Sequence, residues 1–223
     1  MAIDGDVLFG TGLQTRPLLR GYLHLGALVA AVAGTAVMLL QANSTRGYVG
    51  ASVFGASLIV AYGTSAVYHR GHWSGRRLSI VRRLDHATIF FLIAGTYTPF
   101  CLLALHGAWG AALLSVAVTI AALGALVRLI WLDSPRRLTI PLYLASGWVA
   151  LIAMSQILQA LDLAPLGLLI GGGVAYSVGA LAYAAKRPDP WPKVFGYHEV
   201  FHSLTVLGST LHFLAVSLFL LKA

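Results

Sequence analysis

The chain has 223 residues, of which 58% are hydrophobic and only 10% are charged, and its mean hydropathy is +0.82. Soluble domains carry about 25% charged residues, so this composition excludes an ordinary soluble protein and predicts a protein that crosses a membrane several times. The formal net charge is +8, but the basic residues are spread between apolar runs, as the topology of a membrane protein requires. We therefore expect no nucleic-acid partner.

Seven apolar segments follow one another, each about 20 residues long, which is the length that crosses the hydrocarbon core of a bilayer. We expect the first to be a retained helix and not a cleaved signal peptide, because it is long enough to span. Glycines 171–173 lie within the sixth segment, where small residues let helices pack closely. The sequence thus predicts an all-α fold, a single domain over residues 1–223 with spans near 22–42, 48–69, 85–105, 109–131, 140–160, 166–185 and 197–220.

The positions of lysine and arginine predict the orientation, because these residues accumulate in cytoplasmic segments. With the N-terminus inside, only Arg46 and Lys222 of the 15 basic residues fall on the outer side. We therefore expect a multi-pass protein of the cell inner (plasma) membrane, with its N-terminus in the cytoplasm and its C-terminus outside. The basic residues on the inner side are Arg16, Arg20, Arg70, Arg76, Arg77, Arg82, Arg83, Arg128, Arg136, Arg137, Lys186, Arg187 and Lys193.

Several polar side chains lie at the ends of these apolar segments. Ionisable groups inside a bilayer are costly, and their default interpretation is functional. The second segment ends with Ser65 and His69, which share one helical face, and the third begins with Asp85. The seventh begins with His198 and His202, again on one face. In the predicted orientation all these residues lie at the same depth, in the cytoplasmic leaflet.

Three histidines with an open fourth position form a zinc site of the catalytic type. We predict His69, His198 and His202 as the metal ligands. Asp85 would then hydrogen-bond the metal water or a ligand imidazole, and Ser65 could bond the same water or a substrate oxygen. Simpler roles stay open for single residues, since Asp85 could cap its helix and Ser65 could bond the carbonyl four residues before it.

The other histidines are expected to lie outside this site. We interpret His24, His72 and His106 as ordinary polar groups at the membrane interface or in connectors. His212 follows His198 by about 21 Å along a helix, at 1.5 Å per residue, so it cannot join the same metal site.

The seventh segment also contains His198-Glu199-Val200-Phe201-His202, which matches the H-E-x-x-H motif of zinc metalloproteases. The metzincin extension would need a histidine at position 208, where the chain has Gly208. No Leu-Asp pair is followed by glycine, as the third-ligand segment of intramembrane zinc proteases requires. We therefore disfavour a protease and expect Asp85, not Glu199, to be the carboxylate of the site.

Three motifs together resemble the haemolysin III proteins, the bacterial branch of the progestin and adipoQ receptor (PAQR) superfamily. They are Ser65-x-x-x-His69, "RRLDHATIFFLIAGTYTPF" at 82–100 and "FGYHEVFHSLTVLGSTLHF" at 195–213, and "RGYLHLGAL" at 20–28 is similar as well. The resemblance implies seven helices with the N-terminus inside and zinc held by three histidines, with Asp85 and Ser65 near the metal water. It also implies that Glu199 is incidental, since this letter varies in the family.

The resemblance implies more than one function. Receptor members of the superfamily resemble lipid amide hydrolases of the ceramidase kind, whereas the bacterial branch is named for haemolysis and is linked to membrane-lipid homeostasis. Our leading hypothesis is a zinc-dependent hydrolase of lipid amides or esters, in which Asp85 acts as general base or orienting group and Ser65 holds the water or oxyanion. The alternatives are a non-enzymatic membrane sensor or regulator with structural zinc, and a haemolytic pore-forming protein.

Overall fold

The computed structural model describes residues 17–105, 107–131 and 133–222, and within these ranges it is built of helices, with no β-strand. Arg16 and His106, which enter the sequence predictions, lie outside the described residues. Seven helical stretches are long and apolar enough to cross a membrane. The prediction of an all-α protein with seven spans is therefore confirmed.

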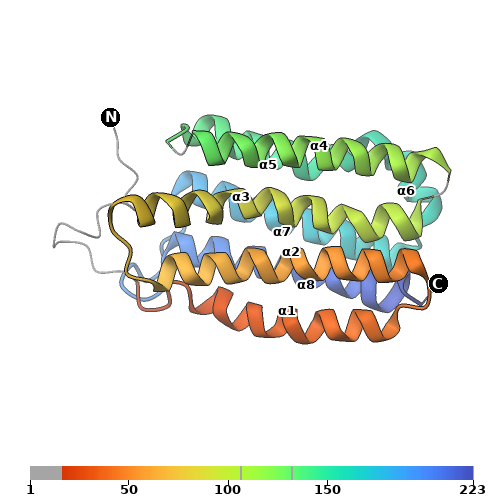
Figure 1. Cartoon of the computed structure of the whole chain (residues 1–223), viewed down its shortest axis with the longest axis horizontal. Coiled ribbons are helices and arrows are strands. Elements are labelled where there is room, and N and C mark those ends of the chain that lie inside the picture. The colour runs from red at the N-terminus through yellow and green to blue at the C-terminus, as the bar shows by residue number, and fades with distance from the viewer. Residues whose placement is uncertain (1–16, 106, 132, 223) are drawn as a thin grey trace.

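The seven stretches run along the long axis of the molecule and alternate in direction (Figure 1). As a result, the end of α2 and the beginnings of α3 and α8 lie at one end of the bundle. The stretches are α1 (Tyr22–Gln41), α2 (Thr45–Arg70), α3 (Gly75–Pro99) with η2 (Phe100–Ala104), α4 (Ala108–Ile130), α5 (Arg136–Gly147) with η3 (Trp148–Ala153) and α6 (Met154–Ala160), α7 (Leu163–Ala185), and α8 (Tyr197–Ala215) with η4 (Val216–Leu220).

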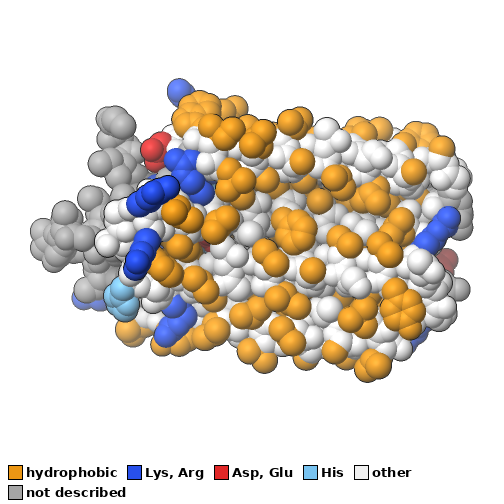
Figure 2. All heavy atoms as spheres, in the orientation of Figure 1, with side chains coloured by type: hydrophobic (Ala, Val, Ile, Leu, Met, Phe, Trp, Pro, Cys, Tyr) orange, Lys and Arg blue, Asp and Glu red, His pale blue; other side chains and the backbone are white. Residues whose placement is uncertain are grey.

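The surface of the bundle has the polarity that a lipid environment selects. Large apolar side chains such as Leu40 and Leu163 are 87% and 88% exposed, which in water would be unfavourable over such an area. Figure 2 shows apolar side chains over most of the length of the visible face, while most of the visible lysines and arginines lie at the end where α3 begins. This is the end that the charge distribution predicts to be cytoplasmic.

Helix α3 begins ten residues before the predicted start of the third span. The prediction placed the start at Asp85, but the helix begins at Gly75 and includes the polar stretch 76–83. Hydropathy marks only the part of a helix that suits lipid, whereas arginine is a good helix former and continues the backbone hydrogen bonds beyond it. The alternative that Asp85 caps its helix is therefore wrong, because this residue lies well inside α3.

Helices α7 and α8 pack closely because two glycines face each other. A Cβ atom on Gly172 would lie 3.0 Å from the carbonyl oxygen of Gly208 and only 2.2 Å from Nε2 of His212. Any side chain at position 172 would therefore push the helices apart or displace the imidazole. This agrees with the packing role that the sequence predicts for the glycines at 171–173.

The orientation of the bundle stays a prediction, and cysteine labelling tests it. Cys101 is the single cysteine of the chain and is buried, so a Cys101→Ala variant has no other thiol that could react with the label. In this background we expect Asp162→Cys, at the start of α7, to react with a membrane-impermeant maleimide in intact spheroplasts. Trp191→Cys, in the connector before α8, should react only after permeabilisation. The reverse pattern would contradict the predicted orientation.

Candidate metal centre

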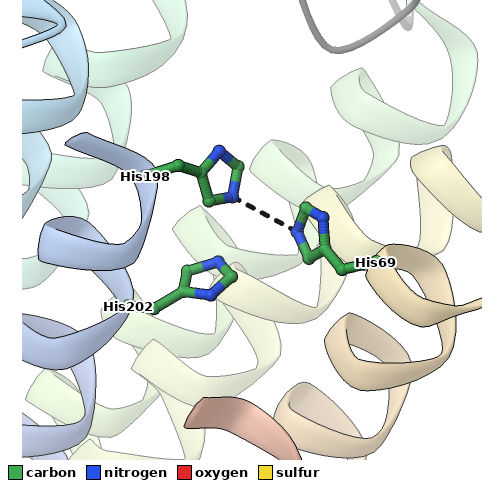
Figure 3. Close-up of side chains that lie close together, drawn as sticks. All are labelled: His69, His198 and His202. Atoms are coloured by element: carbon green, nitrogen blue, oxygen red, sulfur yellow. Dashed lines mark hydrogen bonds between the residues drawn. The ribbon is translucent and has the colours of Figure 1, made fainter. Parts of the chain in front are cut away.

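Three histidines from two helices meet inside the bundle (Figure 3). His69 lies in the last turn of α2, and His198 and His202 lie in the first turns of α8. Each offers a ring nitrogen, and these nitrogens all lie within 4.8 Å of one another. Nε2 of His69 is 3.2 Å from Nε2 of His198, and all three side chains are buried. The three predicted ligands are thus brought together in a group that could hold a metal ion.

Two carboxylates fix the first turn of α8, which carries His198. Oδ1 of Asp189 accepts a hydrogen bond of 2.9 Å from the backbone N–H of Tyr197, and Oε2 of Glu199 accepts one of 2.9 Å from that of Gly196. The first N–H groups of a helix have no partner within the helix, and a negative charge there is favourable. These bonds therefore set the position from which the His198 ring extends toward His69.

Glu199 is buried beside the histidines but does not belong to their group. Its side chain is 0% exposed and forms an ion pair with Arg20, which is itself 8% exposed. Arg20 is brought there by two backbone hydrogen bonds of 3.0 and 3.1 Å, which join residues 18–19 to residues 193–194. Glu199 is thus outside the metal group, yet it is not incidental to the structure, because it ties the start of α1 to the start of α8.

A glycine allows the chain to pass close to His69. Gly21 has a φ of 82°, in the left-handed region that glycine adopts without strain. A Cβ atom here would lie 2.9 Å from Cγ of Arg70 and 3.0 Å from Cβ of His69. Both the backbone conformation and the space therefore favour glycine at this turn, which leads from Arg20 into α1.

His24 is a residue of the site that sequence reasoning missed. The expectation of an ordinary interfacial group is wrong, since His24 is 5% exposed and stacks on the His202 ring at 3.8 Å between centroids and 16° between planes. Its Nδ1 lies 2.7 Å from Oγ of Ser65, so the hydrogen-bond partner of this serine is an imidazole from α1 and not the carbonyl four residues before it in α2. The predicted topology could have indicated this role, because His24 lies in the first turn of the first span, at the same end of the bundle as the three histidines.

A cavity of about 200 Å³ adjoins the histidines and connects the predicted site residues. Its wall includes Ser65, half-buried Asp85, His198 and His202, and His24 lines it too. Apolar and aromatic side chains from α3, α5 and α7 form much of the remaining wall. The geometry thus offers a possible metal group, a carboxylate and a hydroxyl around one space large enough for part of a ligand.

These features define the class of protein: an all-helical, multi-pass membrane protein with a buried three-histidine group that could bind a metal. The comparison with protein families then identifies the family within this class. The family model described as haemolysin-III related matches residues 13–213, so the chain belongs to the haemolysin III family, within the PAQR superfamily.

Individual relatives agree with this assignment. The chain is 31% identical over 200 residues to a hemolysin-3 homolog of Bacillus subtilis (strain 168), covering 89% of this chain and 91% of the relative. It is 28% identical over 200 residues to hemolysin-3 of Bacillus cereus, covering 88% of each. The heptahelical transmembrane protein ADIPOR2 of Oryza sativa subsp. japonica is 32% identical over 187 residues, which cover 75% of this chain and 80% of the plant protein. No solved structure matches the chain.

Metal analysis of the purified protein tests the histidine group. We expect about one metal ion per chain, because three ligands from the protein suffice for an open site. The double variant His198→Ala with His202→Ala should lose the ion, since one remaining ligand cannot hold it. The exposed residue His72 provides the control, and His72→Ala should keep the metal. Metal retained by the double variant would refute the site.

Unfolding in detergent tests the Arg20–Glu199 pair. Arg20→Ala leaves a buried carboxylate without its cation, so the free energy of unfolding should fall by about 3–5 kcal/mol. Combining Arg20→Met with Glu199→Gln removes both charges and should recover part of this loss. Arg46→Ala, at an exposed arginine of the opposite end, should have little effect. Equal losses for the single and double variants would show that the pairing of charges is not the cause.

Proposed function

We propose that the protein is a zinc-dependent membrane hydrolase that cleaves lipid amides or esters and acts in membrane-lipid homeostasis. The observation that carries this proposal is the cavity of about 200 Å³, which brings His198, His202 and Asp85 to one internal surface. A metal that only ties helices together needs no such space. A hydrolytic site needs one, because its substrate must reach both the metal and a group that accepts a proton.

The donor atoms suit zinc. Two nitrogens bound to a tetrahedral zinc at 2.0–2.1 Å lie about 3.3 Å from each other, which is close to the 3.2 Å between Nε2 of His69 and Nε2 of His198. Nδ1 of His202 is buried and has no hydrogen-bond partner among the described residues, so its ring lacks the full set of bonds that a buried imidazole usually forms. Three imidazoles with one open position are the ligand set of catalytic zinc.

The chain's own residues supply the remaining roles. When bound, zinc supplies a Lewis acid that polarises a carbonyl and lowers the pKa of a water toward 7. Asp85 is the carboxylate of the cavity wall that accepts the proton of the attacking water and orients this water. The leaving amine or alcohol then takes up the proton from the Asp85 carboxyl group, which restores the carboxylate.

Ser65 and His24 together offer a hydrogen to the substrate oxygen. If the Ser65 hydroxyl donates to Nδ1 of His24, the neutral imidazole carries its hydrogen on Nε2, which is buried and has no partner among the described residues. If Nδ1 of His24 donates to Ser65 instead, the hydrogen of the Ser65 hydroxyl is available to donate. In either tautomer one donor of the pair is available to stabilise developing charge on the carbonyl oxygen.

A hydrocarbon chain fits the space beyond these residues. A second cavity of about 80 Å³ lies further along the bundle, and its wall is almost entirely apolar. The two cavities share Tyr97, Trp148 and Gly173 in their walls, so they adjoin each other. A lipid whose carbonyl lies at the histidines can extend its chain along this path, with entry from the leaflet at the histidine end.

Asp85→Asn separates hydrolysis from a purely structural role of zinc. The amide cannot accept a proton, so hydrolysis of lipid amides or esters should fall by about 10²–10⁴-fold while the zinc content stays unchanged. Lipid analysis of cells and of reactions with the purified protein measures hydrolysis, and elemental analysis measures the zinc content. Asp162→Asn, at the far end of the bundle, is the matched control. An unchanged biological effect in Asp85→Asn would favour the regulator with structural zinc.

A further inference from the structure

The cavity holds a second set of polar side chains, deeper in the membrane than the histidines. It consists of Tyr62 on α2, Tyr176 on α7, and Ser209 and His212 on α8, which we call the deep polar group. Tyr62, Tyr176 and His212 line the cavity of about 200 Å³. At 1.5 Å per residue, Ser209 lies about 10 Å and His212 about 15 Å further along α8 than His202.

The hydrogens of the three hydroxyl groups in the deep polar group are all used in hydrogen bonds to other protein atoms. Oγ of Ser209 donates its hydrogen to the carbonyl oxygen of Thr205 at 2.9 Å, so it can only accept from its other neighbours. The Tyr62 hydroxyl donates to this oxygen, and the Tyr176 hydroxyl lies 2.7 Å from it and must donate as well. Both tyrosine oxygens therefore keep lone pairs but have no hydrogen left to offer.

The imidazole of His212 is also left as an acceptor. Its Nε2 lies 3.0 Å from the carbonyl oxygen of Leu169, and a carbonyl can only accept, so Nε2 carries the hydrogen. In a neutral imidazole Nδ1 then bears a lone pair, and it is buried with no hydrogen-bond partner among the described residues. The absence of a side chain at Gly172 makes this position of the ring possible, since a Cβ there would lie 2.2 Å from Nε2.

We propose that the deep polar group binds a hydroxyl group carried on the hydrocarbon chain of the lipid substrate. Tyr62, Tyr176 and His212 present three acceptors and no available donor, so they suit a neutral hydrogen-bond donor and disfavour a carboxylate, a phosphate or a ketone. The hydroxyl would stand about 10–15 Å from the carbonyl that the histidine end receives. This inference rests on the proposed function, in that it takes the cavity to hold a lipid.

Energetics make such a group selective. A hydroxyl buried in an apolar environment is unfavourable unless it is hydrogen-bonded, so a chain hydroxyl would be poorly placed elsewhere along the apolar wall. A plain chain fills the same space but leaves the acceptors without a donor. A trapped water could satisfy them instead, and in that case the site would show no preference between chains.

Competition binding with a series of acyl amides of equal length tests the proposal. The zinc-loaded protein in lipid nanodiscs is saturated with a fluorescent acyl probe, which each compound displaces. The series carries a hydroxyl at successive mid-chain positions, and matching compounds carry a methyl ether, a ketone or no substituent there. We expect one hydroxyl position to bind about three- to tenfold tighter than the plain chain, because one net hydrogen bond is gained. The ether and the ketone, which have no hydrogen to donate, should show no gain.

Variants that keep the aromatic rings identify the acceptors. The double variant Tyr62→Phe with Tyr176→Phe removes two of the three acceptors and leaves only Nδ1 of His212, so it should reduce the hydroxyl preference while the plain chain binds as before. Tyr48→Phe, at an exposed tyrosine near the start of α2, should leave the preference intact. Equal affinities for all compounds, or a hydroxyl preference that is unchanged in the double variant, would overturn the proposal. Because binding needs no turnover, a hydroxyl preference without hydrolysis would refute only the proposed activity, and hydrolysis without a preference would refute only this inference.

Discussion

A polar side chain inside a membrane loses its hydration, and it is tolerated where other protein groups replace the lost hydrogen bonds. In this bundle the requirement is met by bringing polar residues from different helices together. Glu199 of α8 meets Arg20 beside α1, and Ser65 of α2 meets His24 of α1. Each of these contacts fixes one helix relative to another, so the needs of the polar groups also determine how the helices pack around the histidines.

The same requirement explains why two carboxylates near the histidines have different roles. Neutral imidazoles leave the charge of a divalent cation uncompensated, so a nearby carboxylate is favourable. Glu199 is already neutralised by Arg20 and also accepts from the backbone of Gly196. Asp85 lies in the wall of the cavity that adjoins the histidines. The glutamate of the H-E-x-x-H motif is therefore part of a structural ion pair, and Asp85, the carboxylate that we propose for the chemistry, comes from another helix.

The sequence was sufficient to predict the seven spans and the grouping of the three histidines. Hydropathy reports the spans directly, and the alternation of direction places the end of the second span and the start of the seventh at one depth. The sequence did not predict the first ten residues of α3, because hydropathy does not detect a polar part of a helix that continues outside the lipid. The burial of Glu199 and His24 was also missed, because it depends on the backbone pairing of residues 18–19 with 193–194 and on the stacking of His24 on His202. Contacts of this kind join distant segments and leave no periodic pattern.

The hydrogen-bonding character of the cavity changes along its length. At the histidine end, His24 and Ser65 together leave one donor, which suits the oxygen of a carbonyl. Near the middle of the bundle, Tyr62, Tyr176 and His212 leave only acceptors, which suit a hydroxyl. A lipid with a carbonyl at one point and a hydroxyl further along its chain satisfies both ends in a single orientation. In the reversed orientation the carbonyl oxygen, which can only accept, would face the acceptors of the deep polar group, so this group disfavours that orientation and favours the carbonyl at the histidines.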